Sequence, residues 1–218
     1  MWTDRARRVV NVLAAANGIL LTAPLMAVVA VLVKLSSPGP VIFVQPRVGL
    51  DRRGDDGFRP VKGLDISRRT FDFGGRIFWI YKFRTMRPAA PNEGQVWAAP
   101  DDPRITAIGH FLRKYRLDEL PQLFNVLKGD MNLVGPRPEQ PSIFVQLRKR
   151  VRGYGRRQQV LPGITGWAQI NLAYDQTIED VQRKVDLDLE YLQRRSAAED
   201  VRIMMRTVPV MVMRRGSM

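Results

Sequence analysis

The sequence predicts an α+β fold that is mainly helical. One long apolar segment lies near the N-terminus, residues 76–86 are rich in aromatic and β-branched side chains, and later stretches repeat apolar residues at helical spacing. We therefore expect a membrane-embedded helix within residues 1–36. Residues 37–218 are expected to form one domain with a small β-hairpin and amphipathic helices at the membrane interface.

Composition limits the partners and the chemistry. The chain has 218 residues, 45% of them hydrophobic, which is enough for one domain with a core. Its net charge of +14 predicts an anionic partner. Charge alone does not decide among nucleic acid, an anionic membrane face and phosphorylated substrates. There is no cysteine for thiol catalysis, and His110, the single histidine, is interpreted as a structural residue.

Residues 9–35 form the one strongly apolar segment, and residues 12–33 are long enough to cross a bilayer. No signal-peptide cleavage site follows, so we expect the segment to be retained. Pro24, near its middle, removes a helix hydrogen bond and is expected to bend the axis. Basic residues flank both ends, whereas a simple span is basic mainly on its cytoplasmic side. Both observations favour a re-entrant helix whose two ends stay on one side.

Residues 41–44 and 76–86 are expected to pair as a hairpin. The polar, glycine-bearing stretch between them, residues 51–75, is interpreted as an insertion of the kind that usually forms a surface loop. No role is assigned to it, and a lid over the site and a partner contact are candidates. On the second strand the two-residue period places Lys82 and Arg84 on the same face.

Four helical patterns follow. The helices are expected over residues 107–115, from the acid pair Asp118–Glu119 to Gly129, over residues 178–195, and over residues 200–213, where Pro209 interrupts an apolar stretch suited to the membrane interface. The basic run at residues 146–159 is interpreted as a solvated or membrane-facing surface.

The acid pair lies before an apolar stripe, and Pro121 is tolerated there only in a first helical turn. Asp118 could simply cap the helix, or the helix start could hold a phosphate or a metal-bridged carboxylate. Arg137 lies between Pro136 and Pro138, which restrict its backbone and suit it to bidentate phosphate recognition, although a surface turn is an equal alternative. Glycines on both sides of Thr165 permit backbone N–H groups to approach a phosphate.

Four motifs together closely resemble the bacterial sugar transferases, the monotopic phosphoglycosyl transferases. In chain order they read YKFRTM, DPRIT, LDELPQLFNVLKGDMNLVGPRPE and PGITGWAQIN. The likeness runs from the apolar segment to near the C-terminus and leaves out only the region around residues 55–74. Members of the family are described as re-entrant, with a Ser-Pro pair at the bend. This chain has Ala23-Pro24 instead, with Thr22 as a candidate substitute hydroxyl.

The resemblance implies that Asp118 attacks the sugar-bearing phosphoryl group of a UDP-sugar, that UMP leaves, and that polyprenyl (undecaprenyl) phosphate then takes the phosphosugar. Glu119 is expected to assist the second step, by accepting a proton or by orienting the acceptor and the metal. Asp118 is also the expected ligand of Mg²⁺, with Mn²⁺ as the alternative. The residues expected to bind substrate are Lys82, Arg84, Arg104, Arg137, Gly163, Thr165 and Gly166.

The same resemblance implies a place at the cytoplasmic face of the bacterial inner membrane and a role in starting lipid-linked glycan or exopolysaccharide assembly. Membrane lipids are expected partners, nucleic acid is not, and a homodimer remains open. Two rival classes stand beside this hypothesis. One is a membrane-anchored basic module that binds anionic lipid or nucleic acid, and the other is a sugar transferase that moves the sugar without its phosphate.

Overall fold

The computed structural model describes residues 2–51, 75–87, 102–172 and 177–212. Within them the α+β, mainly helical architecture is confirmed. The predicted insertion at residues 51–75 lies almost wholly outside the described residues. The helices are α1 (Trp2–Ser36), α2 (Ala107–Lys114), α3 (Gln122–Lys128), α4 (Pro141–Arg150), α5 (Trp167–Asn171), α6 (Ile178–Arg194) and α7 (Ala197–Val212). Two short 3₁₀ helices, η1 (Leu117–Glu119) and η2 (Tyr154–Gln159), and four strands complete the described chain.

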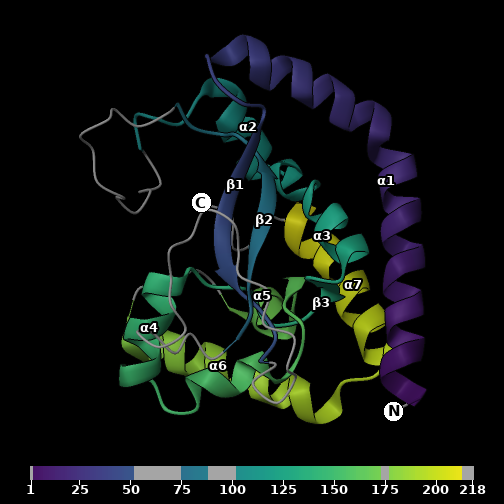
Figure 1. Ribbon diagram of the computed structural model, residues 1–218, viewed down its shortest axis with the longest axis vertical. Helices are drawn as coiled ribbons and strands as arrows, with labels where there is room; N and C mark the ends of the chain where they lie inside the picture. The colour runs from purple at the N-terminus through teal and green to yellow at the C-terminus, as the bar shows by residue number, and fades with distance from the viewer. Residues whose placement is uncertain (1, 52–74, 88–101, 173–176, 213–218) are drawn as a thin grey trace.

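Helix α1 extends beyond the predicted segment at both ends. By length and composition it is able to cross a membrane. Pro24 lies inside one continuous helix, and the hydroxyl of Thr22 donates to the carbonyl of Gly18 at 2.7 Å. In Figure 1 the ribbon of α1 runs along one edge of the molecule and then turns over its top towards α2.

Both ends of α1 are attached to the rest of the molecule. Near its start, the Arg7 guanidinium donates to both carboxylate oxygens of Asp200 in α7, with a shortest distance of 2.8 Å, and to the hydroxyl of Tyr191 in α6. Near its end, Arg84 Nη2 donates to the carbonyls of Val33 and Ser37 at 3.2 and 2.6 Å. These two contacts fix the helix against α6 and α7 at one end and against the segment after β2 at the other.

Strands β1 (Ile42–Val48) and β2 (Ile77–Phe83) form the predicted antiparallel hairpin. Strand β1 runs four residues past the predicted end, through Pro46, which pairs with Trp79. Proline is tolerated there because each strand of a two-stranded sheet has a free edge, to which a residue without an N–H can turn. Strand β2 ends at Phe83, so Arg84 lies beyond it. The two-residue alternation of the strand, which predicted that Arg84 shares a face with Lys82, therefore does not extend to Arg84.

A second sheet was not predicted. Strands β3 (Asn132–Val134) and β4 (Gly163–Thr165) pair in parallel, and the chain around them runs so close that side chains are excluded. A Cβ added to Gly163 would lie 2.1 Å from the backbone nitrogen of Gly135, and one added to Gly166 would lie 2.3 Å from the Gly135 carbonyl oxygen. These glycines are therefore required for close backbone packing.

The core joins α1 to the hairpin and to α3. Ala15 of α1 is buried in one cluster with Phe78 and Ile80 of β2 and with Val126 of α3. Helix α6 begins with a capping box between Thr177 and Asp180 and buries Val185 completely, as its predicted apolar stripe requires. Helix α7 continues through Pro209, which corrects the predicted interruption: proline removes one internal hydrogen bond, and the other backbone N–H groups of the helix can still donate.

Candidate active site

The acid pair lies in η1, one turn before α3. Pro121 occupies the N-cap of α3, so the predicted position of the two acids in the first turn of that helix was wrong by one turn. Asp118 and Glu119 are only 8% and 7% exposed. Arg116, directly before η1, has a φ of 53°, a left-handed conformation that costs a non-glycine residue about 1–2 kcal/mol. Strain of this kind is often retained at functional sites.

Two cations converge on one oxygen of Glu119. Lys82 Nζ of β2 lies 2.7 Å from Glu119 Oε1, and Arg137 Nη2 lies 2.8 Å from the same oxygen. Lys82 Nζ is 3.9 Å from Asp118 Oδ2, beyond hydrogen-bond distance. Glu119 is therefore neutralised by direct contacts, whereas Asp118 lies beside the same cluster without being tied into it by Lys82.

The two carboxylates consequently titrate differently. Burial raises the pKa of Asp118, with the charge of Lys82 opposing this effect. Burial would also raise the pKa of Glu119, but the charges of Arg137 and Lys82 outweigh it and hold the pKa of that carboxyl below its usual range. Burial lowers the pKa of Lys82, against the opposing effect of Glu119. Paired acids with separated pKa values are a common feature of catalytic sites.

Arg137 is held at both of its terminal nitrogens. Besides the contact with Glu119, Arg137 Nη1 donates to the side-chain oxygen of Gln169 in α5 at 3.3 Å. Sequence reasoning missed Gln169, although it lies within the PGITGWAQIN motif, because a single glutamine carries no spacing signal, whereas the glycines of the motif do. The motif thus reaches the site through Gln169.

The three motif residues predicted to bind substrate have other contacts. Gly163 and Gly166 permit the close packing of β4 against the segment after β3. The Thr165 hydroxyl lies 2.8 Å from the hydroxyl of Thr207 in α7. None of these contacts brings the three residues to the acid pair, so their substrate-binding role stays a prediction.

Arg84 and Arg104 also bind groups other than the acid pair. Arg84 bonds the carbonyls at the end of α1, and Arg104 forms an ion pair with Asp102, with Nη2 2.6 Å from Oδ2. Arg104 lowers the pKa of Asp102 to about 2 through this side-chain contact and through its backbone N–H. Of the four predicted cations, Lys82 and Arg137 contact the acid pair, while Arg84 and Arg104 support neighbouring backbone and acid groups.

Asn125 positions the strand that carries Lys82. Its side chain is fully buried in α3, where Oδ1 accepts from the Tyr81 N–H at 3.0 Å and Nδ2 donates to the Trp79 carbonyl at 2.7 Å. An amide that mimics a β-ladder partner therefore joins α3 to β2. Asn125 was missed because its neighbours carry the helical apolar pattern, and only a buried polar residue within that pattern could have signalled it.

The donor set limits the metal that the site could hold. The described residues contain no group of three or more His, Cys, Asp or Glu side chains able to hold a metal ion. Asp118 and Glu119 are hard oxygen donors, of which Glu119 Oε1 already contacts two cations. Such a set fits Mg²⁺, which typically binds one or two carboxylates and takes its other ligands from water and substrate phosphates.

Comparison with known proteins supplies the wider family. A family model described as bacterial sugar transferase matches residues 2–62 and 66–214. The chain is 41% identical over 202 residues to the UDP-N-acetylgalactosamine-undecaprenyl-phosphate N-acetylgalactosaminephosphotransferase of Aeromonas hydrophila, covering 93% of this chain and 42% of that protein.

Two proteins named UDP-glucose:undecaprenyl-phosphate glucose-1-phosphate transferase are similar as well. The one from Escherichia coli is 39% identical, covering 93% of this chain and 39% of its own length. The one from Caulobacter vibrioides is 38% identical, covering 94% of this chain and 69% of its own length. The chain thus spans about two fifths of the first two relatives and about two thirds of the third. With a family match that covers nearly all its residues, the chain belongs to the bacterial sugar transferase family.

Proposed function

We propose that the chain transfers a sugar-1-phosphate from a UDP-sugar to undecaprenyl phosphate and releases UMP. The observation that carries this proposal is the asymmetry of the buried acid pair. Glu119 is bound by Lys82 and Arg137, whereas Asp118 lies next to the same cations, 3.9 Å from Lys82. The names of the relatives give the same class of donor and acceptor.

Asp118 is the proposed nucleophile. A carboxylate oxygen of Asp118 attacks the phosphorus that bears the sugar, the bond to the bridging oxygen breaks, and UMP leaves with that oxygen. An oxygen of undecaprenyl phosphate then attacks the same phosphorus, the acyl phosphate bond breaks, and the carboxylate of Asp118 is restored. Burial that raises the pKa of Asp118 makes its ionised form a more basic nucleophile than an exposed aspartate.

Glu119 is better suited to orienting than to proton transfer. A carboxyl whose pKa is held low by Arg137 and Lys82, against burial, is a weak general base. Its two ion pairs instead fix Lys82 and Arg137 beside Asp118, where their remaining N–H groups are available to a diphosphate. Of the two roles expected for Glu119, the contacts favour orientation.

Asp118, with Glu119 beside it, would hold Mg²⁺. When bound, this ion supplies positive charge that offsets the repulsion between the carboxylates and a diphosphate. Lys82 and Arg137 bring two positive charges of their own to the same place, each within 2.8 Å of Glu119 Oε1.

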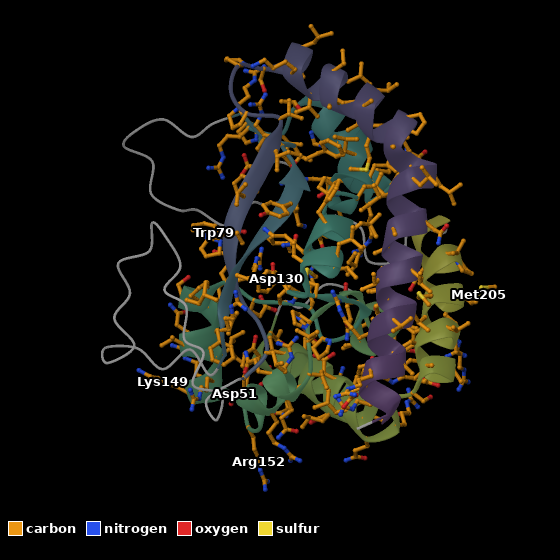
Figure 2. All side chains as sticks on the ribbon, turned by 45° about the vertical axis from the view of Figure 1, so that its right-hand side comes forward. Asp51, Trp79, Asp130, Lys149, Arg152 and Met205 are labelled. Carbon is orange, nitrogen blue, oxygen red and sulfur yellow. The ribbon has the colours of Figure 1, made fainter. Side chains whose placement is uncertain are left out.

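Membrane binding brings the lipid acceptor to this site. Leu20, Leu21 and Leu35 of α1 are 73–80% exposed, and Met205 of α7 is 70% exposed. Figure 2 shows Met205 pointing outward on one side of the molecule, whereas Lys149 lies on the opposite side and Arg152, also from the basic run, points away from the bottom. The exposed apolar side chains thus favour a membrane face on α1 and α7, with the basic run turned towards the cytoplasm.

The two attached ends of α1 support a re-entrant helix. Arg7 binds Asp200 and Tyr191, and Arg84 binds the last turn, so both ends contact one domain and are expected on one side of the membrane. Pro24 accounts for a change of direction in between, because it leaves the carbonyl of Leu20 without its helical partner. UDP-sugars are cytoplasmic, so the proposed donor requires this domain at the cytoplasmic face, which for a bacterial protein is that of the inner membrane.

Product analysis tests the proposal. Purified protein in detergent is incubated with Mg²⁺, undecaprenyl phosphate and, in turn, UDP-glucose, UDP-galactose and their N-acetyl forms. We expect UMP and a lipid diphosphate sugar with at least one donor. UDP and a lipid monophosphate sugar would show transfer of the sugar without its phosphate. The absence of any nucleotide product with every donor would instead favour the alternative hypothesis, a basic module that binds anionic lipid or nucleic acid.

A further inference from the structure

Residues 136–139, which carry Arg137, are held by a hydrogen bond at every carbonyl. The four donors come from three separate parts of the chain: β1, η2 and β4. The bonds run from Gly163 N to Pro136 O (3.0 Å), from Arg157 Nη2 to Arg137 O (3.1 Å), from Arg47 Nη1 to Pro138 O (3.1 Å) and from Val48 N to Glu139 O (2.9 Å). Pro136 and Pro138 have no N–H group, so this segment cannot form a regular hydrogen-bonded ladder. The segment is held instead by donors from other parts of the chain.

Arg157 is the buried member of this set. It is 4% exposed, although it lies in the basic run that the sequence presented as surface. Its Nε lies 2.7 Å from Asp188 Oδ2 in α6, its Nη2 donates to the Arg137 carbonyl, and its guanidinium carbon lies 5.0 Å above the ring of Tyr154. Asp188 is 2% exposed, so the ion pair is desolvated.

We propose that Arg157 and Asp188 are positioning residues for the reaction. The pair fixes the carbonyl of Arg137, and through it the backbone from which the Arg137 side chain reaches Glu119 and the phosphates. Asp188 holds the guanidinium plane by its Nε edge, which leaves Nη2 aimed at the Arg137 carbonyl. The chemical steps that this serves are those of the proposed function, on which the inference rests.

A buried ion pair is a poor way to gain stability, because removing two charges from water offsets most of their attraction. Its value here is geometric. Displacing a substrate-binding group by about 1 Å can lower a rate up to about a hundredfold. Arginine is needed for this task because one planar guanidinium reaches Asp188 and the Arg137 carbonyl in two directions at once, whereas the single nitrogen of lysine cannot.

Two substitutions separate positioning from folding. Arg157→Lys keeps a positive charge for Asp188 but loses the bond to the Arg137 carbonyl, and Asp188→Asn keeps the shape but loses the charge. For both we expect kcat/KM for the UDP-sugar to fall about tenfold to a hundredfold. In an Arg137→Gln background the same substitutions should cost less than about threefold, because the group that they position is gone.

Asp200→Asn is the matched control. Asp200 forms another buried ion pair, with Arg7, on the side of the molecule that holds α1. Its effect on kcat/KM should be the same in the wild-type and Arg137→Gln backgrounds. If Arg157→Lys and Asp188→Asn also lower kcat/KM by the same factor in both backgrounds, the inference is overturned, because the pair then does not act through Arg137.

Hydrogen exchange gives a readout that needs no turnover. The N–H groups of Val48 and Gly163 donate to the carbonyls of Glu139 and Pro136, so their exchange reports how firmly residues 136–139 are held. Arg157→Lys should accelerate both, and Asp200→Asn neither. Unchanged exchange in Arg157→Lys would reject the inference, whereas a wild-type protein that releases no UMP would reject the proposed function and leave the exchange result standing.

Discussion

Asp118 and Glu119 are neighbours in sequence, yet Glu119 has two cations within 2.8 Å of one oxygen, whereas Lys82 lies 3.9 Å from Asp118. The difference follows from the short 3₁₀ turn, which directs Glu119 towards β2 and the segment after β3. The Asp-Glu pair was readable from the sequence, and so was a basic surrounding. The cations that contact Glu119 could not be predicted, because Arg137 and Lys82 lie 18 and 37 residues away from it in the sequence and no local pattern encodes such contacts.

The pH dependence of activity tests this electrostatic arrangement. Burial raises the pKa of Asp118 and Lys82 partly opposes it, so the acid limb of kcat/KM should lie above the usual aspartate value of about 3.9. Removing the charge in Lys82→Met should raise the pKa of Asp118 further and move the acid limb to higher pH. A pH–rate profile of both proteins measures this, and a limb that stays in place or moves to lower pH would contradict it.

A single substitution of Glu119 tests whether this residue orients the two cations or acts as a general base. Glu119→Gln removes the negative charge that holds both cations and should slow UMP release and acceptor transfer together, since the role assigned to Glu119 is orientation of Lys82 and Arg137. A loss confined to acceptor transfer, measured by single-turnover kinetics, would instead make Glu119 a general base.

Arg137→Lys should lower kcat/KM by at least about tenfold, because lysine cannot contact Glu119, Gln169 and a phosphate from one planar group. Steady-state kinetics at several UDP-sugar concentrations measures this loss. Arg183→Lys, on α6, is a suitable control because no contact places Arg183 at the acid pair. Near-normal activity in Arg137→Lys would remove Arg137 from the site.

At the scale of elements, the sequence predicts what is local. The hairpin, α2, α6 and the glycine that ends α3 follow from periodicity, capping and backbone preference, and Gly129 indeed has a φ of 87°. The β3–β4 sheet could not be predicted, because two three-residue strands 31 residues apart at their starts, Asn132 and Gly163, carry too little pattern. The role of Arg157 was missed for a related reason, since a run of arginines and lysines does not reveal which member is buried.

Asn125 gives a prediction at this scale. Asn125→Ala leaves the Tyr81 N–H and the Trp79 carbonyl without the partner that joins α3 to β2, at about 1–3 kcal/mol for each group. The two groups together cost at least about 2 kcal/mol, so Tm should fall by no less than roughly 4–8 °C for a chain of this size. Thermal unfolding in detergent measures it. Asn171→Ala, at an exposed side chain, should change Tm far less, and equal effects would contradict the assigned role.

On the scale of the whole molecule, α1 packs into the domain that holds the acid pair, besides being long and apolar enough to cross a membrane. Ala15 belongs to the core beneath the hairpin, and Arg8 Nη2 donates to the Leu127 carbonyl at the end of α3. The sequence predicted an apolar helix, but its two attachments could not be predicted because they depend on residues as far away as Asp200.

The re-entrant arrangement is tested by thiol labelling. The chain has no cysteine, so Thr3→Cys and Arg152→Cys each introduce a single reactive group. With a membrane-impermeant reagent, neither should be labelled in intact spheroplasts and both should be labelled after lysis. Arg152→Cys serves as the cytoplasmic reference, and labelling of Thr3→Cys alone before lysis would show a full span.

Intact-protein mass spectrometry asks most directly whether Asp118 carries the phosphosugar. Protein is mixed with UDP-sugar and Mg²⁺ without acceptor, and Asp118→Asn serves as a nearly isosteric control that preserves the size of the side chain. We predict a mass increase equal to one sugar phosphate on the wild type, lost when undecaprenyl phosphate is added, and no increase on Asp118→Asn. An unmodified wild type that nevertheless releases UMP on turnover, or an Asp118→Asn variant that releases it at a comparable rate, would contradict covalent transfer through Asp118.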